Sequence, residues 1–369
     1  MPRRITRSLC SGFAIVVILS ASALPQSLSK HQKKAIDAAV ADFMKANNIP
    51  AASVAVGIRE KIVFSKGYGM ADLEQNVPVT PKTRFRTGSI AKPITAVGAM
   101  QLAEKGKLDL NAPVQRYCPV FPKKEWTVTT RQLLSHRAGV RHYRNETENA
   151  NAKHYASLND SITGIFGNDP LLFEPGTKMT YSSYGYVVIG CAMEGASSSP
   201  YAKYMTENVF TPAGMSDTAV DDSAAIVFNR VRFYDRGPGT VTNAPFFDSS
   251  DRIPGGGFVS TPEDLLRFVF ALQSGKLMSS KTLDEMWTSA GARDDKADYA
   301  LGWNIAKVAS PPRVIFHNGA QVGASARLAV DPDDHIVYAI MTDVRGLEWN
   351  KFASTMEKIV FPARATASK

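Results

Sequence analysis

Short β-rich runs lie near both ends of this sequence, and helical patterns fill the stretch between them. Residues 51–58 and 62–68 are rich in β-branched residues and flank a charged turn, which predicts an antiparallel hairpin. Comparable runs lie near the other end, at 314–317, 324–330 and 336–342. This order predicts one antiparallel sheet built from both termini, with a mainly helical lobe inserted into it.

Apolar residues at helical spacing mark the other elements. The first such series runs from Ile36 to Met44 and ends before Pro50. Further helices are expected at 89–105, 262–272 and 349–360. The predicted class is therefore α/β and two-lobed, with a sheet lobe of about 30–85 and 255–369, flanked by helices, and a helical lobe of about 89–235.

The first 23 residues have the pattern of an export signal. Three arginines precede a short apolar core at 12–19, and Ala21-Ser22-Ala23 supplies a small-residue cleavage site. The core is too short to span a bilayer comfortably, and an uncleaved signal anchor is the alternative. We therefore expect a mature chain of 24–369 that is secreted or periplasmic, with no stable membrane span after cleavage.

The charge balance argues against a nucleic-acid-binding protein. The chain has 43 basic and 34 acidic residues, and 44% of its residues are hydrophobic. Outside the export signal the basic excess is spread without a run of five like charges, as on an ordinary solvated surface. The expected partner is a small-molecule or peptide substrate, and the oligomeric state stays open.

Cysteine usage predicts neither a disulfide scaffold nor a metal site. Cys10 lies in the export signal, so the mature chain keeps Cys118 and Cys191. Two buried free thiols are favoured over one disulfide for this pair, although an oxidising compartment permits the bridge. The sequence contains no CxxC, HExxH or EF-hand pattern, so no metal and no cofactor are predicted.

Ser89 and Lys92 form an S-x-x-K pattern where a loop gives way to a helix. Positions three apart share one face of a helix, so the amine can reach the hydroxyl. Lysine activates serine only when its pKa falls from about 10.4 toward neutrality, which burial and a second cation can cause. The pattern alone is weak, because Ser27 and Lys30 match it too and Ser89 could be an ordinary N-cap.

Two later motifs strengthen the interpretation of Ser89. Tyr181-Ser182-Ser183 follows a turn, and His317-Asn318-Gly319 ends a strand-like run. The order S-x-x-K, Y-x-polar and H-x-G resembles the penicillin-recognising serine hydrolases, which include class C β-lactamases, D-alanyl-D-alanine carboxypeptidases and esterases. Further matching segments are 133–140 and 255–262. Segments 139–143 and 319–325 are similar to the serine β-lactamase-like subgroup that has mitochondrial and bacterial members.

The resemblance implies a role for each matching residue. Ser89 would be the acylated nucleophile, Lys92 its base and Tyr181 the proton relay to the leaving group. The backbone N–H groups of Ser89 and of Ala320, just past Gly319, would form the oxyanion hole. The remaining site residues implied are the substrate contacts Ser183 and His317.

Two of these positions depart from the family pattern. Ser183 stands where many relatives carry asparagine, which weakens an expectation of β-lactam or peptide preference. His317 replaces the lysine of class C β-lactamases. Since histidine titrates near pH 6.5, His317 is expected to attract a substrate carboxylate more weakly as pH rises from about 5.5 to 7.5.

The sequence thus predicts an exported serine hydrolase that cleaves an amide or ester through a Ser89 acyl-enzyme. The alternative is a penicillin-binding or scaffold protein with little turnover. An α/β-hydrolase triad is disfavoured because no G-x-S-x-G elbow occurs. His136 and His142 are expected to be structural, and Trp303 either lines the site or belongs to the core.

Overall fold

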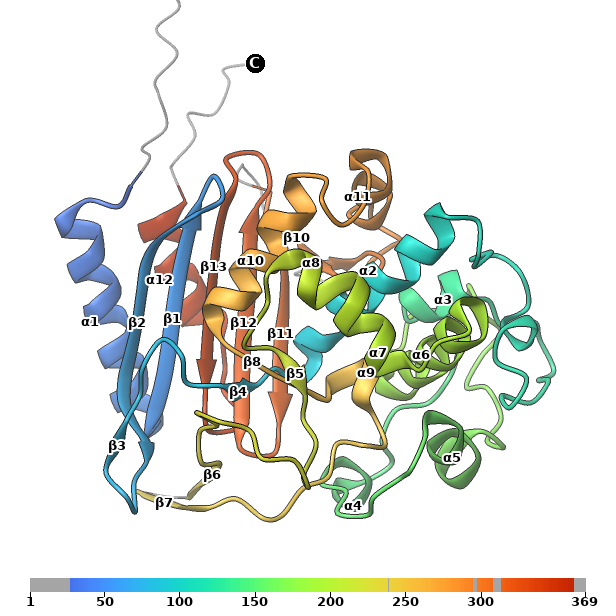
Figure 1. Cartoon of the computed structure of the whole chain (residues 1–369), viewed down its shortest axis with the longest axis horizontal. Coiled ribbons are helices and arrows are strands. Elements are labelled where there is room, and N and C mark those ends of the chain that lie inside the picture. Colours follow the sequence, from blue (N-terminus) through green and yellow to red (C-terminus); the bar gives the residue numbers. More distant parts are fainter. Residues whose placement is uncertain (1–26, 238, 295–296, 308–312, 362–369) are drawn as a thin grey trace, which may run out of the picture.

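The two ends of the chain meet in one antiparallel sheet (Figure 1). The computed structural model describes residues 27–361 except 238, 295–296 and 308–312. Its largest sheet has eight strands in the order β3-β2-β1-β13-β12-β11-β10-β9. β1 pairs with β13, and Ala52 lies opposite Thr342. The bounds are β1 Ala51–Ile58, β2 Lys61–Asp72, β3 Val77–Pro78, β9 Ala297–Tyr299, β10 Asn304–Ala306, β11 Ile315–Gln321, β12 Ala324–Asp331 and β13 Ile336–Thr342.

Both faces of the central strands are covered by helices. Tyr338 and Ile340 of β13 pack in an apolar cluster with residues of α1 (Lys30–Asn47) and α12 (Asn350–Val360). Val337 and Ala339 pack in a second cluster, with α10 (Pro262–Gln273). Alternate residues of a strand point to opposite faces, so both sets must be apolar and the strands read as continuous apolar runs. The prediction of an antiparallel sheet from both termini, flanked by helices, is confirmed.

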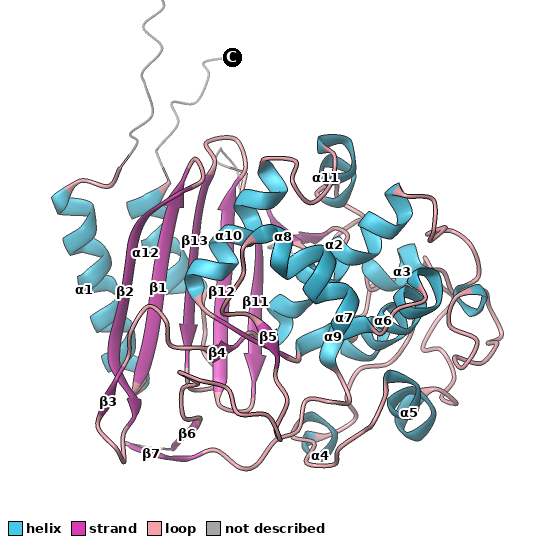
Figure 2. Ribbon diagram, in the orientation of Figure 1, coloured by secondary structure: helices cyan, strands magenta, loops and turns pink. Residues whose placement is uncertain are grey.

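The other helices gather beyond β11 (Figure 2). α2 (Ala91–Glu104) packs against α6 (Ser183–Ser197), and both are buried along most of their length because few of their residues are polar. The remaining helices are α3 Thr130–Leu134, α4 Glu146–Asn149, α5 Leu158–Ser161, α7 Tyr201–Met205, α8 Thr211–Ala213, α9 Ile253–Gly256 and α11 Ser280–Met286. Short helical turns are η1 Gly88–Ile90, η2 Val114–Arg116, η3 Ile162–Phe166 and η4 Thr206–Phe210.

Several strands were not predicted because they are too short to show a period. They include β9 and β10 at the sheet edge, the three-stranded sheet β4-β8-β5 and the hairpin β6-β7. The bounds of the small strands are β4 Phe85–Arg86, β5 Ala219–Val220, β6 Tyr234–Gly237, β7 Thr240–Asn243 and β8 Phe258–Ser260. β11 also runs through Gly319 to Gln321, so the third motif lies inside a strand and does not end one.

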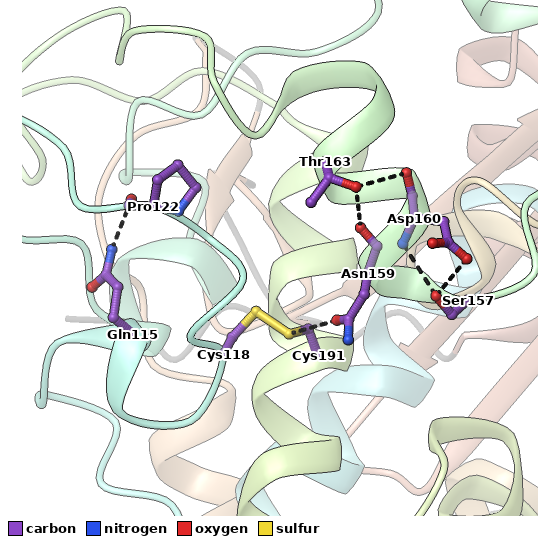
Figure 3. Close-up of a disulfide and its surroundings, with 8 residues drawn as sticks. All are labelled: Gln115, Cys118, Pro122, Ser157, Asn159, Asp160, Thr163 and Cys191. Atoms are coloured by element: carbon purple, nitrogen blue, oxygen red, sulfur yellow. Dashed lines mark hydrogen bonds between the residues drawn. A yellow bond between two sulfur atoms is a disulfide. The ribbon is translucent and has the colours of Figure 1, made fainter.

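The prediction of two free thiols is wrong. Cys118 and Cys191 form a disulfide that joins the segment after η2 to the middle of α6 (Figure 3). Both residues are buried, and Asn159 lies beside the bond. Sequence alone could not pair them, because they are 73 residues apart and meet only when α6 packs against that segment.

The predicted export signal at 1–23 lies outside the described residues. Within the ranges that the structure covers, no helix combines the length and the apolar character needed to cross a membrane.

Candidate active site

Ser89 lies where a short strand turns into a helix. β4 leads through Thr87 into η1 and directly on into α2. Gly88 has a φ of +49°, and a Cβ there would lie 2.6 Å from the Ala320 nitrogen, so only glycine lets this turn pack so closely on β11. Gly88 and Ile90 are buried, whereas Ser89 is half-buried. The fold therefore presents a single hydroxyl at the head of α2.

Lys92 is fully buried one turn further along α2. Its Nζ lies 2.9 Å from Ser89 Oγ, 3.0 Å from Ser183 Oγ and 2.6 Å from the Gly255 carbonyl oxygen. Burial lowers the pKa of Lys92 well below its usual value, and the positive charge of Arg252 lowers it further. The amine therefore loses its proton far more readily than a surface lysine does.

These three contacts suit a neutral amine that acts as a base. A neutral amine has two N–H donors and one lone pair. The Gly255 carbonyl can only accept and takes one N–H, and Ser183 Oγ can take the second. The lone pair is then left for the Ser89 hydroxyl, whose proton it can remove.

Tyr181 stands beside this pair. Its ring centroid is 4.7 Å from Lys92 Nζ. Burial raises the pKa of Tyr181, and a hydrogen bond with Ser89 only partly offsets that effect. The side chain therefore stays a phenol at neutral pH. It can pass a proton along, but it is a poor base.

Two histidines hold the Tyr181 segment in place. The Ser182 N–H donates to His136 Nδ1 and the Ser183 N–H donates to His142 Nδ1, both at 3.2 Å. The His136 ring also packs on Tyr181, with 4.3 Å between centroids. This arrangement agrees with the structural role expected for both residues. His142 additionally lines the cavity beside Ser89, which the sequence did not indicate.

The edge of β11 passes next to the nucleophile. A Cβ on Gly319 would lie 2.0 Å from the Thr87 carbonyl oxygen and 3.3 Å from the Ser89 nitrogen, so glycine permits this approach. Ala320 follows and lines the same cavity as Ser89. The N–H groups of Ser89 and Ala320, which the resemblance assigns to an oxyanion hole, thus belong to the adjoining segments η1 and β11.

His317 lies near Tyr181, with 6.4 Å between ring centroids, and it is not among the residues that line the cavity. Its Nδ1 lies 2.7 Å from the Asn318 carbonyl oxygen and its Nε2 lies 3.2 Å from the Tyr299 hydroxyl. Burial lowers the pKa of His317 to about 3, with nearby Lys92 as a smaller cause. The expected change of charge between pH 5.5 and 7.5 is therefore corrected: the ring stays neutral across this window, because it has no contact with water.

A cavity of about 240 Å³ opens in front of Ser89. Besides the residues predicted from the motifs, its lining includes Tyr143, Arg252 and Gln321, which the sequence did not single out. Arg252 stands three residues before the Gly255-Gly256-Gly257 run, and Tyr143 ends the segment 139–143. Arg252 therefore lies outside the segments that match the family, and no spacing rule distinguishes Tyr143 from its neighbours within segment 139–143.

Arg252 is a buried cation whose charge is already compensated. Its Nε and one NH₂ group each lie 2.7 Å from a carboxylate oxygen of Asp251. It also donates to the carbonyl oxygens of Asn149 and Glu148. The guanidinium stacks 4.1 Å from the Tyr143 centroid. Arg252 thus lowers the pKa of Lys92 while its own donors are largely engaged within the fold.

Ser183 lines the cavity, but its hydroxyl also accepts from Lys92. Trp303 belongs to the core, since it is fully buried against Trp287 and Phe268. In the described part of the chain, no group of three His, Cys, Asp or Glu side chains could hold a metal ion.

Larger hollows lie elsewhere on the molecule. One of about 360 Å³ is lined by residues of α1 and α12, and another of about 430 Å³ lies between α2 and α11. We assign the site to the smaller cavity because its lining contains Ser89, whose hydroxyl is hydrogen-bonded to a buried amine.

Comparison with known proteins gives one consistent family. Residues 36–354 match the family model described as Beta-lactamase. The human protein "Serine beta-lactamase-like protein LACTB, mitochondrial" is 30% identical over 379 residues, covering 77% of this chain and 69% of the relative.

Solved structures agree on the fold. EstCE1, described as a hydrolase with promiscuous acyltransferase activity, superimposes with a TM-score of 0.78 at 20% identity, covering 90% of this chain and 98% of its own. The D-amino acid amidase from Ochrobactrum anthropi SV3, complexed with L-phenylalanine, gives a TM-score of 0.78 at 22% identity, covering 88% and 98%. At these identities the likeness shows the fold alone.

Proposed function

Because this chain belongs to the beta-lactamase family, we propose that it is an exported serine hydrolase that cleaves an amide or ester through a Ser89 acyl-enzyme. The observation that carries this proposal is the 2.9 Å contact between Ser89 Oγ and the fully buried Lys92 Nζ. A buried amine of low pKa beside a half-exposed hydroxyl is the arrangement that makes serine nucleophilic.

In the acylation step, Lys92 accepts the hydroxyl proton as Ser89 Oγ attacks the carbonyl carbon of the substrate. The negative oxygen that forms is stabilised by the N–H groups of Ser89 and Ala320, which are worth about 3 kcal/mol each in comparable sites. The carbon–leaving-group bond then breaks, and the departing alcohol or amine receives the proton from Lys92 through Tyr181.

In the second step, water hydrolyses the ester formed on Ser89. Neutral Lys92 takes one proton from the water while the hydroxide attacks the acyl carbon. When the carbon–Oγ bond breaks, Ser89 Oγ recovers that proton and the acid product leaves. Each turnover thus consumes one water and restores both residues.

Export is supported by two separate features. Residues 1–23 carry the export pattern, and the disulfide between Cys118 and Cys191 is typical of an oxidising compartment. The test is the N-terminal sequence of the protein recovered from the periplasm or medium of an expressing bacterium. We expect it to begin at Leu24; full-length protein confined to the cytoplasm would contradict export.

Covalent labelling tests the catalytic assignment. The mature protein is incubated with a fluorophosphonate and, separately, with a labelled penicillin, and its intact mass is measured. We expect a fluorophosphonate adduct that Ser89→Ala abolishes. Ser27→Ala, which removes the exposed serine of the other S-x-x-K match, is the control and should label normally. An adduct that persists in Ser89→Ala would refute the nucleophile. Labelling by penicillin without turnover of any ester or amide would favour the penicillin-binding alternative.

A further inference from the structure

We infer that Gln321 is a specificity-determining residue that binds an uncharged amide group in the acyl part of the substrate. This inference rests on the proposed function, because it assumes that an acyl group is transferred to Ser89. It assigns a role to a residue that belongs to none of the three sequence motifs.

The position of Gln321 on β11 places it at the site. Alternate residues of a strand share a face, so His317, Gly319 and Gln321 point to the same side of the sheet. The His317 ring centroid is 6.4 Å from that of Tyr181, and Gly319 lies against the Ser89 nitrogen. Gln321 is therefore on the far side of the nucleophile from Tyr181, and it lines the cavity there with Gly256 and Ala320.

The side-chain amide of Gln321 is buried without a complete set of partners. The residue is 8% exposed, and its Nε2 has no hydrogen-bond partner within the described chain. Its Oε1 lies against Gly256: a Cβ added to Gly256 would lie 3.0 Å from this oxygen. A buried amide left unpaired is costly, so a site that keeps one gains when a ligand supplies the missing bond.

The charges around the cavity favour an amide over a carboxylate as that ligand. Arg252 is ion-paired with Asp251 and bonded to two carbonyl oxygens. Burial lowers the pKa of His142 to about 3, so its ring is neutral near pH 7. Burial also lowers the pKa of Lys92, and its amine is already bonded within the fold to Ser183 and to the Gly255 carbonyl oxygen. A carboxylate in this space would find no cation whose donors are free to pair with it. Burying an unpaired carboxylate costs far more free energy than burying a neutral amide.

An amide also matches Gln321 in either orientation. A carboxamide side chain has a donor end and an acceptor end, and a half-turn exchanges them. A substrate amide carries both an N–H and a C=O, so it can complete the hydrogen bonding of Gln321 whichever end faces the cavity. An alkyl acyl group can neither donate nor accept a hydrogen bond.

The test compares three p-nitrophenyl esters with one leaving group and acyl parts of similar length. They are the N-acetylglycyl ester, the pentanoyl ester and the glutaryl monoester. The rate of Ser89 acylation is followed by intact mass, which does not require turnover. In the parent protein we expect the N-acetylglycyl ester to acylate at least tenfold faster than either of the others.

Variants then assign the preference to Gln321. Gln321→Leu and the nearly isosteric Gln321→Glu should each lower the ratio of N-acetylglycyl to pentanoyl acylation at least fivefold. The matched control is Gln273→Leu, which removes another glutamine whose Nε2 lacks a partner but which lies on α10, away from the cavity. Gln273→Leu should leave the ratio unchanged.

The outcomes separate this inference from the proposed function. If the parent protein is not labelled by a fluorophosphonate at Ser89, the proposed function fails. If Ser89 is labelled but the ester ratio is the same in the parent and in both Gln321 variants, only the role of Gln321 is refuted. Preferred acylation by the glutaryl monoester, or no acylation by any ester despite fluorophosphonate labelling, would also refute it.

Discussion

At the scale of single residues, burial decides which group can act as the base. Both Lys92 and Tyr181 lie beside Ser89; Lys92 is fully buried, and Tyr181 is half-buried at the cavity. Burial disfavours the charged form of each, so it lowers the pKa of the amine and raises that of the phenol. One physical effect thus favours the neutral amine of Lys92, which can act as a base, and keeps Tyr181 a protonated phenol.

Replacing Lys92 tests this division of roles. Lys92→Met keeps an unbranched side chain but removes the base, and we expect Ser89 labelling to slow at least about a hundredfold. In the parent, labelling should rise with pH as the amine loses its proton, and it should level off well below pH 10.5. Lys66→Met, on the surface of β2, is the control and should label at the parent rate. A normal rate in Lys92→Met would rule the base out.

The buried histidines make the fold sensitive to acid. The pKa of His317 is lowered to about 3 in the folded protein, against about 6.5 in an unfolded chain. Below about pH 6.5, His317 therefore binds a proton in the unfolded chain but stays unprotonated in the folded protein. The stability that the neutral ring provides is complete above that pH and is lost as pH falls toward 3, by up to about 1.4 kcal/mol per pH unit.

Denaturant unfolding measured from pH 4 to pH 6 tests this linkage. We expect the free energy of unfolding of His317→Gln to depend less steeply on pH than that of the parent, by up to about 1.4 kcal/mol per unit. His31→Gln, which changes an exposed histidine on α1, serves as the control and should keep the parent slope. Equal slopes in His317→Gln and the parent would show that His317 already titrates as it does when unfolded.

At the scale of elements, the start of α6 is the most constrained part of the site. Ser182 is its N-cap, with Oγ accepting from the Gly185 N–H at 2.9 Å and donating to the Arg141 carbonyl at 2.7 Å. The N–H groups of Ser182 and Ser183 are held by His136 and His142. A free helix end has unpaired N–H groups, and here those bonds fix the segment that carries Tyr181.

Removing the cap should therefore affect catalysis as well as stability. Ser182→Ala should cost about 1 kcal/mol of unfolding free energy and slow acylation of Ser89, because Tyr181 loses its anchor. The matched control is Ser279→Ala, since Ser279 caps α11 away from the cavity. It should cause a similar loss of stability with a normal acylation rate. Equal acylation rates in the two variants would show that the Ser182 cap does not contribute to acylation of Ser89.

At the scale of the whole molecule, the site forms where segments from distant parts of the chain meet. Ser89 comes from the head of α2, Tyr181 from the start of α6, Arg252 from the loop before α9 and Ala320 from β11. The disulfide closes a long loop that ends within α6. Closing a loop of this length reduces the entropy of the unfolded chain by an amount equivalent to about 4 kcal/mol.

Loss of the disulfide should accordingly destabilise the protein as a whole. We expect the double variant Cys118→Ser, Cys191→Ser to lose about 2–5 kcal/mol of unfolding free energy, measured by denaturant. Adding a reductant should destabilise the parent to a similar extent and leave the double variant unchanged. If reductant has no effect on the parent, the bridge does not contribute to its stability.

Much of the architecture could be predicted from the sequence, because the relevant signals are local. Runs rich in β-forming residues located β1, β12 and β13, and helical spacing of apolar residues located α1. The Ser89–Lys92 spacing placed a hydroxyl and an amine on one helix face. The strands β9 and β10 left no such signal, because three residues are too few to show a period.

Tertiary structure alone decided the properties that depend on burial and on meetings between distant segments. Only packing brings Cys118 to Cys191 and places the charge of Arg252 close enough to lower the pKa of Lys92. Packing also leaves the Nε2 of Gln321, a residue that lines the cavity, buried without a partner. It also excludes water from His317, which keeps the ring neutral where its sequence suggested a titrating group. The sequence by itself determined which residues could do the chemistry; the folded surroundings determined their charge, their partners and the shape of the space before them.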